Sequence, residues 1–363
     1  MKEAVMRADH PLRDIPHRLS LALADLCRQG TIGAVLGLAV PGRAPLLLAA
    51  GHADIARTQA VTPGYQFCIG SQSKSFTAVT ALSLIKAGLL DLDRPVADYA
   101  ADLRHGGEVT MRQLLTHQSG LGNGHALLTP PKRLPDREVG FDELETLSLA
   151  DGRHFAAGER FEYNNYGYAL AAHVMARATG TPYESLLRDR VLAPLGLNQT
   201  RLGRRRADLP PGLMASGWYR PDPTLDFADM ADGGDLFWAG SSGAMVSDLG
   251  DLLHWYQCLR DGSAGGIGLA DCLATQVADP HQGMRTAYAL GLECRMFGGI
   301  PCWGHGGRVL GYLSAGFVEP ESGITLALLT NLAETGVADL TATMMLIQSV
   351  ASLALHAGLD MVE

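Results

Sequence analysis

Predicted strands lie near both ends of the chain, and this arrangement constrains the fold more than any other feature of the sequence. Residues 36–53, LGLAVPGRAPLLLAAGHA, are typical of a β-hairpin that turns at Pro41–Gly42. Residues 308–330 indicate two further strands joined by a turn at Pro320–Gly323. The middle of the chain, about 75–245, has helical periodicity interrupted by proline- and glycine-rich loops. We therefore expect the two ends to meet in one sheet.

Lysine is scarce, with four lysines against 25 arginines, yet two of the four follow a serine by three positions. The pairs are Ser71–Lys74 and Ser83–Lys86, whereas composition alone predicts about 0.2 such pairs. This spacing places a hydroxyl and an amine on one helical face, as a lysine-assisted serine nucleophile requires. Because an ordinary lysine is protonated at neutral pH, burial or a neighbouring cation must lower its pKa before it can act as a base.

Sequence context favours the first of these two pairs. An alternating apolar segment ends at Gly70, and an apolar helical pattern begins at once. Ser71 therefore lies at the start of a helix, where backbone N–H groups can stabilise an oxyanion. Ser83 lies in mid-helix, and Lys86 lies in the last turn, where a cation complements the helix carbonyls. Ser71 is the candidate nucleophile; the alternative is an N-cap serine beside a solvated Lys74.

A second candidate motif is Tyr163-x-Asn165, which precedes an apolar helical pattern over 168–178. A phenol close to a lysine ammonium has a lowered pKa, and as a phenolate it can take the serine proton. Asn165 offers an amide donor and an acceptor that suit Lys74 and a substrate amide. The alternative is an asparagine helix cap and a packed tyrosine.

A third candidate, His305-Gly306-Gly307, is predicted to open a strand ahead of a hairpin. The His-x-Gly spacing itself carries little information, since about 1.4 matches are expected by chance. The other matches start at His105, His281 and His356. The strand context distinguishes His305, because glycines let a substrate backbone pair along an edge strand. The alternative is a structural histidine.

Taken in order, Ser71-x-x-Lys74, Tyr163-x-Asn165 and His305-x-Gly307 resemble the three signature elements of the penicillin-recognising serine hydrolases. That group includes class C β-lactamases, D,D-carboxypeptidases, D-aminopeptidases, D-amino-acid amidases and β-lactamase-like esterases. The resemblance covers roughly residues 20–355. Its supporting segments are LLTHQSGL (114–121), NNYGYAL (164–170), APLGL (193–197) and SSGAMVSDLGDLL (241–253).

The resemblance implies an α/β fold of the α+β type. An antiparallel sheet is flanked by N- and C-terminal helices, and a mostly helical lobe is inserted between the two halves of the sheet lobe. The boundaries that we expect are 1–74 and 246–363 for the sheet lobe and 75–245 for the helical lobe, with the active site at their junction.

The resemblance also implies roles for the motif residues. Ser71 would form an acyl-enzyme, and Tyr163 and Lys74 would share the acid–base work, with the identity of the base left open. The oxyanion hole would consist of the backbone N–H groups of Ser71 and Arg308. Neither a cofactor nor a metal is implied. The residues that would bind or support the substrate are Asn165, His305, Gly306, Gly307 and, through its backbone, Arg308.

Histidine stands at position 305 where many β-lactamases carry lysine, so the chain resembles the amidases and peptidases of the group more closely. We expect a hydrolase of D-amino-acid amides or short D-peptides. The alternatives are an esterase or acyltransferase that uses the same groups, and an inactive ligand-binding relative. Amidases that select a free α-amino group need a carboxylate near the pocket, and no acid follows LLTHQSGL before Asp136. The possible substitutes are Glu159, Glu162, Asp229 and Asp235.

The composition narrows the range of partners. A net charge of −9 and a pI of about 5.7 argue against nucleic acid. No apolar run approaches the ~18 residues of a membrane span. The N-terminus carries charges throughout, and Leu19–Leu26 indicate an amphipathic helix rather than a signal peptide, so we expect a cytoplasmic protein with free thiols. The expected partner is a small-molecule substrate, and the sequence leaves the oligomeric state open.

Overall fold

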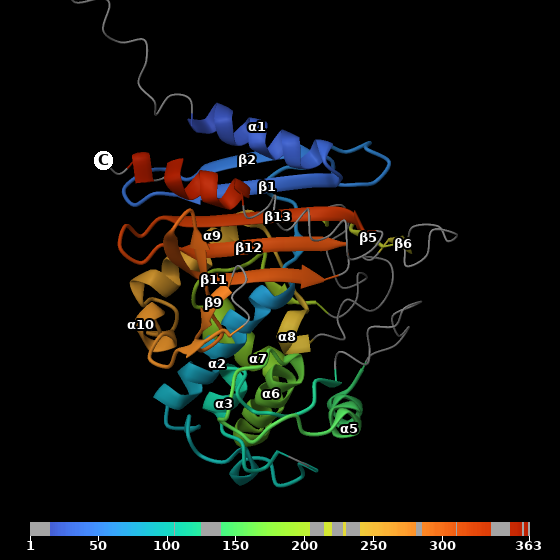
Figure 1. Ribbon diagram of the computed structural model, residues 1–363, viewed down its shortest axis with the longest axis vertical. Coiled ribbons are helices and arrows are strands. Elements are labelled where there is room, and N and C mark those ends of the chain that lie inside the picture. Colours follow the sequence, from blue (N-terminus) through green and yellow to red (C-terminus); the bar gives the residue numbers. More distant parts are fainter. Residues whose placement is uncertain are drawn as a thin grey trace, which may run out of the picture.

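Figure 1 shows the computed structural model of the chain. A large sheet occupies one part of the molecule, and most helices of the middle segment lie together in the other. The structure describes residues 15–104, 106–124, 139–203, 214–219, 228–229, 240–280, 285–309, 311–334, 349–357 and 359–361.

The large sheet is built from both ends of the chain, as the sequence predicts. Its strands run in the order β2-β1-β13-β12-β11-β10-β9-β8, all antiparallel, and β5 adds a short parallel rung to β13. The strands are β1 (Thr31–Ala39), β2 (Leu46–Gly51), β5 (Trp218–Tyr219), β6 (Ala228–Asp229), β8 (Val277–Ala278), β9 (Arg285–Tyr288), β10 (Glu293–Phe297), β11 (Ile300–Val309), β12 (Tyr312–Val318) and β13 (Thr325–Glu334).

The central strands β1 and β13 are buried on both faces, which explains their nearly continuous apolar sequences. Alternate residues point to opposite faces of a strand. In β1, Val35 packs into the core cluster on one face, and Leu36 packs into the cluster on the other. In β13, Leu329 and Leu328 divide between the two clusters in the same way. The two ends of the chain therefore build one two-sided core.

The first and last helices cover the same face of the sheet (Figure 1). Helix α1 (Ile15–Arg28) buries Ile15, Leu19, Leu23 and Leu26, the apolar stripe of an amphipathic helix. The helical segment 349–357 packs into the same cluster through Val350 and its neighbours. The predicted antiparallel sheet flanked by N- and C-terminal helices is confirmed.

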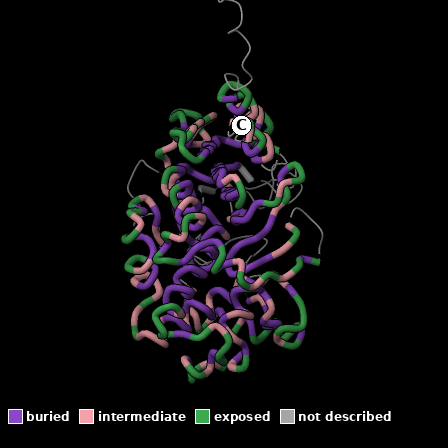
Figure 2. Tube along the Cα trace, turned by 90° about the vertical axis from the view of Figure 1, so that its left-hand side faces the viewer, coloured by how far each residue is buried: buried purple, intermediate pink, exposed green. Residues whose placement is uncertain are grey.

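The other face of the sheet carries α9, and beyond it lies the helical region (Figure 1). Figure 2 shows that buried segments run through the middle of both regions and exposed segments surround them. The helices and single turns are η2 (Gly70–Gln72), α2 (Ser73–Lys86), η3 (Val96–Asp98), α3 (Met111–Leu115), α5 (Phe141–Asp151), α6 (Asn165–Thr179), α7 (Tyr183–Leu187), η4 (Arg188–Leu192), α8 (Gly240–Gly243), α9 (Leu249–Asp261) and α10 (Leu269–Cys272).

Helix α2 passes through the centre of the molecule and is buried on every side from Ser73 to Leu84. Its start is anchored by a second, small sheet of order β3-β7-β4, made of β3 (Phe67–Cys68), β7 (Met245–Ser247) and β4 (Arg201–Leu202). The backbone N–H of Met245 donates to Ser73 Oγ over 3.1 Å, which ties β7 to the first turn of α2. A helix placed in this way holds its N-terminal residues firmly between the sheet and the other helices. The lobe boundaries at 74/75 and 245/246 stay a prediction.

One predicted strand differs from the structure. The sequence places the start of a strand at His305, whereas β11 begins five residues earlier, at Ile300, and His305 lies inside it. The reason is a hairpin between β10 and β11, which turns at Gly298 and Gly299, where φ is +58° and +92°, so that Ile300 pairs with Phe297. Among the described helices, none combines the length and the apolar character needed to cross a bilayer.

Candidate active site

Ser71 lies in the single turn η2, between β3 and the central helix α2. The turn begins at Gly70, whose φ of +55° falls in the left-handed region that favours glycine. A Cβ atom at Gly70 would lie 2.7 Å from the backbone nitrogen of Arg308. Glycine at position 70 therefore lets the Ser71 turn lie directly against strand β11.

Strand β12 holds the same turn from the sheet side. Ser314 Oγ donates to the carbonyl of Ile69 over 2.8 Å, and Gln72 Nε2 donates to Ser314 Oγ over 2.6 Å. The hydroxyl of Tyr256, on α9, donates in turn to Gln72 Oε1 over 2.9 Å. These hydrogen bonds are buried, so the residues on both sides of Ser71 have fixed positions.

Lys74 lies on α2, and its side chain is fully buried. Its Nζ lies 3.1 Å from Ser71 Oγ, 2.7 Å from Asn165 Oδ1 and 2.7 Å from the Ser242 carbonyl oxygen. Burial lowers the pKa of Lys74 well below its ordinary value; the charge of Glu293 opposes this change. A lysine with such a pKa can exist as a neutral amine, whose lone pair can accept the Ser71 proton.

The structure brings Tyr163 to the same hydroxyl. Tyr163 precedes α6, and its side chain forms a hydrogen bond with Ser71. Lys74 Nζ lies over the Tyr163 ring, 4.8 Å from the ring centroid. Burial raises the pKa of Tyr163 above its ordinary value, and the hydrogen bond with Ser71 only partly offsets this effect. The prediction of a lowered phenol pKa is therefore wrong, because desolvation outweighs the hydrogen bond with Ser71 and the charges of Arg285 and Arg295. Tyr163 is a neutral phenol that can donate a proton.

Asn165 is the first residue of α6, and the helix cap is its neighbour Asn164. Asn164 Oδ1 accepts from the Gly167 N–H over 2.9 Å. Asn165 therefore does not cap the helix, and its side-chain oxygen accepts from Lys74. The asparagine that caps this helix is therefore Asn164, and not Asn165 of the motif.

His117, in the LLTHQSGL segment, fixes the chain on both sides of Tyr163. Its carbonyl accepts from the Glu162 N–H over 2.9 Å, and its Nδ1 accepts from the Asn164 N–H over 3.0 Å. The His117 and Tyr163 rings lie 4.2 Å apart between centroids. His117 adopts a φ of +59°, which is uncommon for a residue with a side chain. The segment thus serves to place the phenol.

His305 lies on β11 and is 2 % exposed. The Tyr288 hydroxyl lies 2.9 Å from His305 Nε2, and Nδ1 contacts the Gly306 carbonyl. A carbonyl only accepts, so Nδ1 carries the proton and Nε2 accepts from Tyr288. Burial lowers the pKa of His305 to about 4, so the imidazole is neutral at pH 7. Its ring centroid lies 6.3 Å from that of Tyr163, and His305 lines the same pocket from the β11 side.

The part of β11 that extends past the last β10–β11 pair faces the Ser71 turn. The two strands pair as far as Glu293 opposite Gly304. The next N–H on that edge, from Gly306, donates to Glu293 Oε1 over 2.6 Å. Alternate N–H groups of a strand point to the same edge, so the Arg308 N–H points the same way, toward the Ser71 turn. The assignment of the Ser71 and Arg308 N–H groups as oxyanion donors stays a prediction.

Glycines at two positions of β11 make this close packing possible. A Cβ at Gly306 would lie 2.3 Å from Arg295 Nη2, and one at Gly307 would lie 1.9 Å from the Ile69 carbonyl oxygen. Both distances are far below van der Waals contact. The lack of a side chain at Gly307 lets the Ser71 turn approach β11, and the lack of one at Gly306 makes room for a charged cluster on β9 and β10.

That cluster consists of Glu293, Arg285 and Arg295, and the sequence analysis missed it. Glu293 Oε1 accepts from Arg295 Nη2 over 2.7 Å, and Oε2 accepts from Arg285 Nη1 over 3.5 Å. Arg285 also donates to Asp279. Burial by itself would raise the pKa of Glu293, but Arg295 and the other groups around the carboxylate lower it to about 2. Glu293 is a buried carboxylate at every physiological pH.

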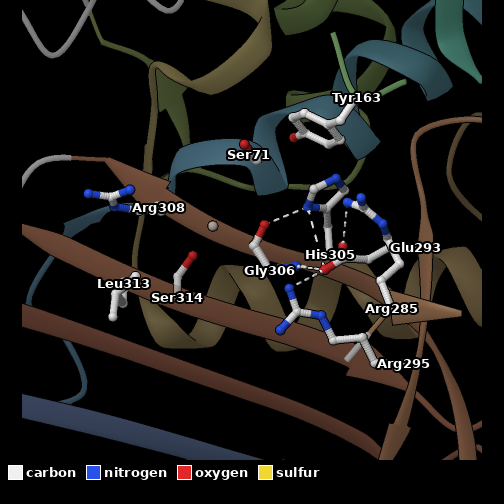
Figure 3. A pocket seen from close by; sticks show the side chains of 11 residues that line it. Ser71, Tyr163, Arg285, Glu293, Arg295, His305, Gly306, Arg308, Leu313 and Ser314 are labelled. Carbon is white, nitrogen blue, oxygen red and sulfur yellow. Dashed lines mark hydrogen bonds and ion pairs between the residues drawn. The ribbon is translucent and has the colours of Figure 1, made fainter. Parts of the chain in front are cut away.

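These residues surround a pocket of about 330 Å³ above Ser71 (Figure 3). Ser71 and Tyr163 lie on one side, and the β11 residues and the charged cluster lie on the other. Among the described residues, the lining comprises Ser71, Tyr163, Arg285, Glu293, Arg295, His305, Gly306, Gly307, Arg308, Leu313 and Ser314.

Among the described residues that line the pocket, the carboxylate is that of Glu293, which the sequence analysis did not name. Glu162 bonds to His154, and Glu159 pairs with Arg160 at the surface. Asp229 lies on β6, and Asp136 and Asp235 lie outside the described residues. A sequence signal for Glu293 exists in GLECRM, where Glu293 and Arg295 alternate with apolar residues and so share one face of a strand. No group of three His, Cys, Asp or Glu residues in the described part of the chain is placed to hold a metal ion.

Comparison with known proteins is consistent with this site. The family model described as Beta-lactamase matches residues 12–348. Penicillin-binding protein 4 of Amycolatopsis lactamdurans is 29% identical over 296 residues, 75% of this chain and 74% of that protein. A D-aminopeptidase of Brucella canis is 27% identical over 283 residues, 77% of this chain. The chain spans about half the length, 52%, of that aminopeptidase.

Solved structures with similar sequences also have the same fold as this chain. D-amino acid amidase from Ochrobactrum anthropi SV3, complexed with L-phenylalanine amide, superposes with a TM-score of 0.84 at 27% identity. The match covers 94% of this chain and 99% of the amidase. A D-stereospecific amidohydrolase from Streptomyces sp. superposes with a TM-score of 0.77 at 25% identity, over 93% and 98% of the two chains. With a family model that matches nearly its whole length, this chain belongs to the beta-lactamase family and is a serine hydrolase.

Proposed function

We propose that this serine hydrolase cleaves the amide bonds of D-amino-acid amides or short D-peptides through an acyl-serine intermediate. The observation that carries the proposal is the 3.1 Å distance between Lys74 Nζ and Ser71 Oγ. At that distance a neutral amine can take the hydroxyl proton as Oγ attacks the amide carbonyl carbon. Burial lowers the pKa of Lys74, which favours the neutral amine.

The other groups complete the reaction in this proposal. As the Oγ–C bond forms, the carbonyl oxygen becomes an oxyanion that accepts from the backbone N–H groups of Ser71 and Arg308. The C–N bond then breaks, and the Tyr163 phenol protonates the leaving nitrogen. Tyr163 regains a proton from the Lys74 ammonium. A water oxygen then bonds to the acyl carbon and its proton passes to Lys74. The C–Oγ bond breaks, Lys74 returns the proton to Ser71 Oγ, and the acid product leaves.

The relatives support the amide class of substrate. The chain is similar over nearly its whole length to a D-amino acid amidase and over most of its length to D-aminopeptidases. A pocket of about 330 Å³ fits a ligand the size of an amino-acid amide. Glycines 306 and 307 keep side chains off the β11 backbone, so an extended substrate backbone can lie along this strand.

A second candidate substrate carries a carboxylate on its leaving group. Three arginines and one glutamate line the described part of the pocket, and the glutamate already binds two of the arginines. A pocket with an excess of positive charge attracts anions and disfavours a substrate ammonium. Paired D-dipeptides with a free and an amidated C-terminus distinguish the two candidates. Faster cleavage of the free acid would favour the carboxylate substrate, and faster cleavage of the amide would favour the first.

Intact-mass analysis with a fluorophosphonate tests the proposed chemistry. The Ser71 Oγ–P bond forms, the P–F bond breaks, and fluoride leaves, so the protein gains one phosphonyl group. We expect one adduct per chain, on Ser71, and none in Ser71→Ala. An unmodified wild-type chain under forcing conditions would favour the inactive ligand-binding relative.

A substrate panel then separates the remaining alternatives. We expect higher kcat/KM for D-amino-acid amides than for their L-isomers, for matched p-nitrophenyl esters and for a cephalosporin. Higher kcat/KM for the esters would favour the esterase, and amide products formed in the presence of added amines would favour acyl transfer. A cytoplasmic location remains a prediction.

A further inference from the structure

We propose that Glu293 is a positioning residue that holds the β11 backbone in register against the Ser71 turn and balances the charges of Arg285, which lies over the Tyr163 ring, and Arg295. The proposal rests on the proposed acyl-serine chemistry, since the backbone that it positions is the oxyanion-binding edge. Glu293 touches no reacting atom, and its effect passes through Gly306, Arg285 and Arg295.

The first argument is the place where the strand ladder ends. Glu293 forms the last pair of β10 with Gly304 of β11 among the described residues. The ladder hydrogen bonds between two strands hold their register, and the β10–β11 ladder ends at this pair. The Glu293 side chain extends the contact between the two strands, because Oε1 accepts the Gly306 N–H over 2.6 Å. Gly306 lies two residues before Arg308, so this hydrogen bond sets the direction of the segment that faces Ser71.

The second argument is the fit of the cluster to β11. A Cβ at Gly306 would meet Arg295 Nη2 at 2.3 Å and Glu293 Oε1 at 3.1 Å. The absence of a side chain at 306 is therefore what lets the carboxylate and guanidinium lie flat against the strand. Glu293 is 1 % exposed, and a buried carboxylate persists only where donors satisfy it. The donors here are Gly306, Arg295 and Arg285.

The third argument connects the same carboxylate to the phenol. Arg285 lies over the Tyr163 ring, with its guanidinium carbon 5.2 Å from the ring centroid, and also over Phe161 at 5.1 Å. Glu293 and Asp279 both bind Arg285, so they fix the guanidinium in this position. The Glu293 charge also opposes the lowering of the pKa of Lys74, while Arg285 adds to it. The carboxylate thus affects both the oxyanion edge and the acid–base pair.

The test compares Glu293→Gln and Glu293→Ala with a matched control, Glu145→Gln. Glu145 is 3 % exposed, and it also accepts a backbone N–H and an arginine, both from Arg104, but it lies on α5 away from the pocket. The first readout is the second-order rate constant for fluorophosphonate labelling of Ser71. The second is the dependence of that rate constant on pH, and thermal unfolding reports folding.

We expect Glu293→Ala to label about 10²-fold more slowly than wild type, the scale of a misplaced reacting group. Glu293→Gln keeps an acceptor for the Gly306 N–H, so most of that loss should be recovered. Because the glutamine removes a charge that raises the pKa of Lys74, the acid limb of its profile should move to lower pH. Glu145→Gln should match wild type in rate and profile. A merely structural role would leave the acid limb unmoved.

The outcomes separate this inference from the proposed function. Failure of the wild-type chain to label would overturn both. If the wild type labels Ser71 and folded Glu293→Ala labels equally fast, only the positioning role falls. If the alanine variant does not fold, Glu293→Gln decides alone, and an acid limb at the wild-type pH contradicts the proposal.

Discussion

The two ends of helix α2 carry the same Ser-x-x-Lys spacing in different surroundings. At the start, Ser71 precedes the helix, and its hydroxyl bonds to a fully buried Lys74 and to Tyr163. At the end, Ser83 donates to the Thr80 carbonyl over 2.7 Å inside the helix. The exposed Lys86 donates to the Gly266 carbonyl over 2.9 Å. Spacing alone therefore does not make a nucleophile; a hydroxyl outside the helix ladder and a desolvated amine do.

The largest expected difference between the two ends concerns the serines. Ser71→Ala removes the attacking oxygen, so kcat/KM should fall by at least about 10³-fold, on the scale of losing a catalytic nucleophile. Ser83→Ala removes only a hydrogen bond to a helix carbonyl, so kcat/KM should change less than about threefold. Steady-state kinetics of both variants on the same amide substrate measures the contrast. The opposite result would place the nucleophile at the wrong end of the helix.

The lysines should show the next largest contrast. Lys74→Met keeps the apolar length of the side chain but removes the base, and we expect turnover to fall by about 10³-fold. Lys86→Met removes one exposed hydrogen bond, so activity should stay near that of wild type. Single-turnover acylation rates report the step directly. Equal rates for the two variants would mean that Lys74 does not act on Ser71.

Removal of the phenol hydroxyl should have a smaller effect than loss of the base. Tyr163→Phe leaves the ring between His117 and Arg285 but deletes the proton donor, so amide acylation should slow by about 10²-fold. Esters with good leaving groups need less protonation and should lose less. The ratio of amide to ester rates checks this role, and an unchanged ratio would remove Tyr163 from leaving-group protonation.

The smallest expected effect is the pH dependence of stability that arises from His305. Burial lowers the pKa of this imidazole from 6.5 to about 4, so the folded chain binds fewer protons than the unfolded chain between these values. This contribution to the free energy of unfolding is present above pH 6.5 and is lost as the pH falls toward 4. Denaturant unfolding of His305→Asn and wild type should show a shallower slope for the variant in that window. Equal slopes would contradict a neutral, buried imidazole.

Features that follow from local residue spacing, and the joining of the two chain ends in one sheet, could be predicted from the sequence. The hairpin at 36–53 and the sheet of joined ends follow from apolar patterns, and the closeness of Ser71 and Lys74 follows from helical geometry. The raised pKa of Tyr163 could not be predicted from the sequence, because it comes from burial and burial depends on the whole fold.

Contacts between residues on neighbouring strands could not be predicted from the sequence either. Glu293 meets Gly306 only through the register of β10 and β11, thirteen residues away in the chain. The start of β11 was misplaced although the sequence holds a turn signal, because Gly298-Gly299 is a dipeptide typical of two-residue hairpins and both residues adopt positive φ. Backbone donors such as the Arg308 N–H have no side-chain signature at all.

The central claim is that burial lowers the pKa of Lys74 far enough for its amine to act as a base toward Ser71. With only four lysines in the chain, ¹⁵N-lysine labelling gives a simple NMR spectrum, and Lys74→Met and Lys86→Met assign the two signals. We predict that the Lys74 Nζ signal titrates well below about 10.4, the ordinary lysine pKa. A Lys74 signal that titrates near that value would contradict the account.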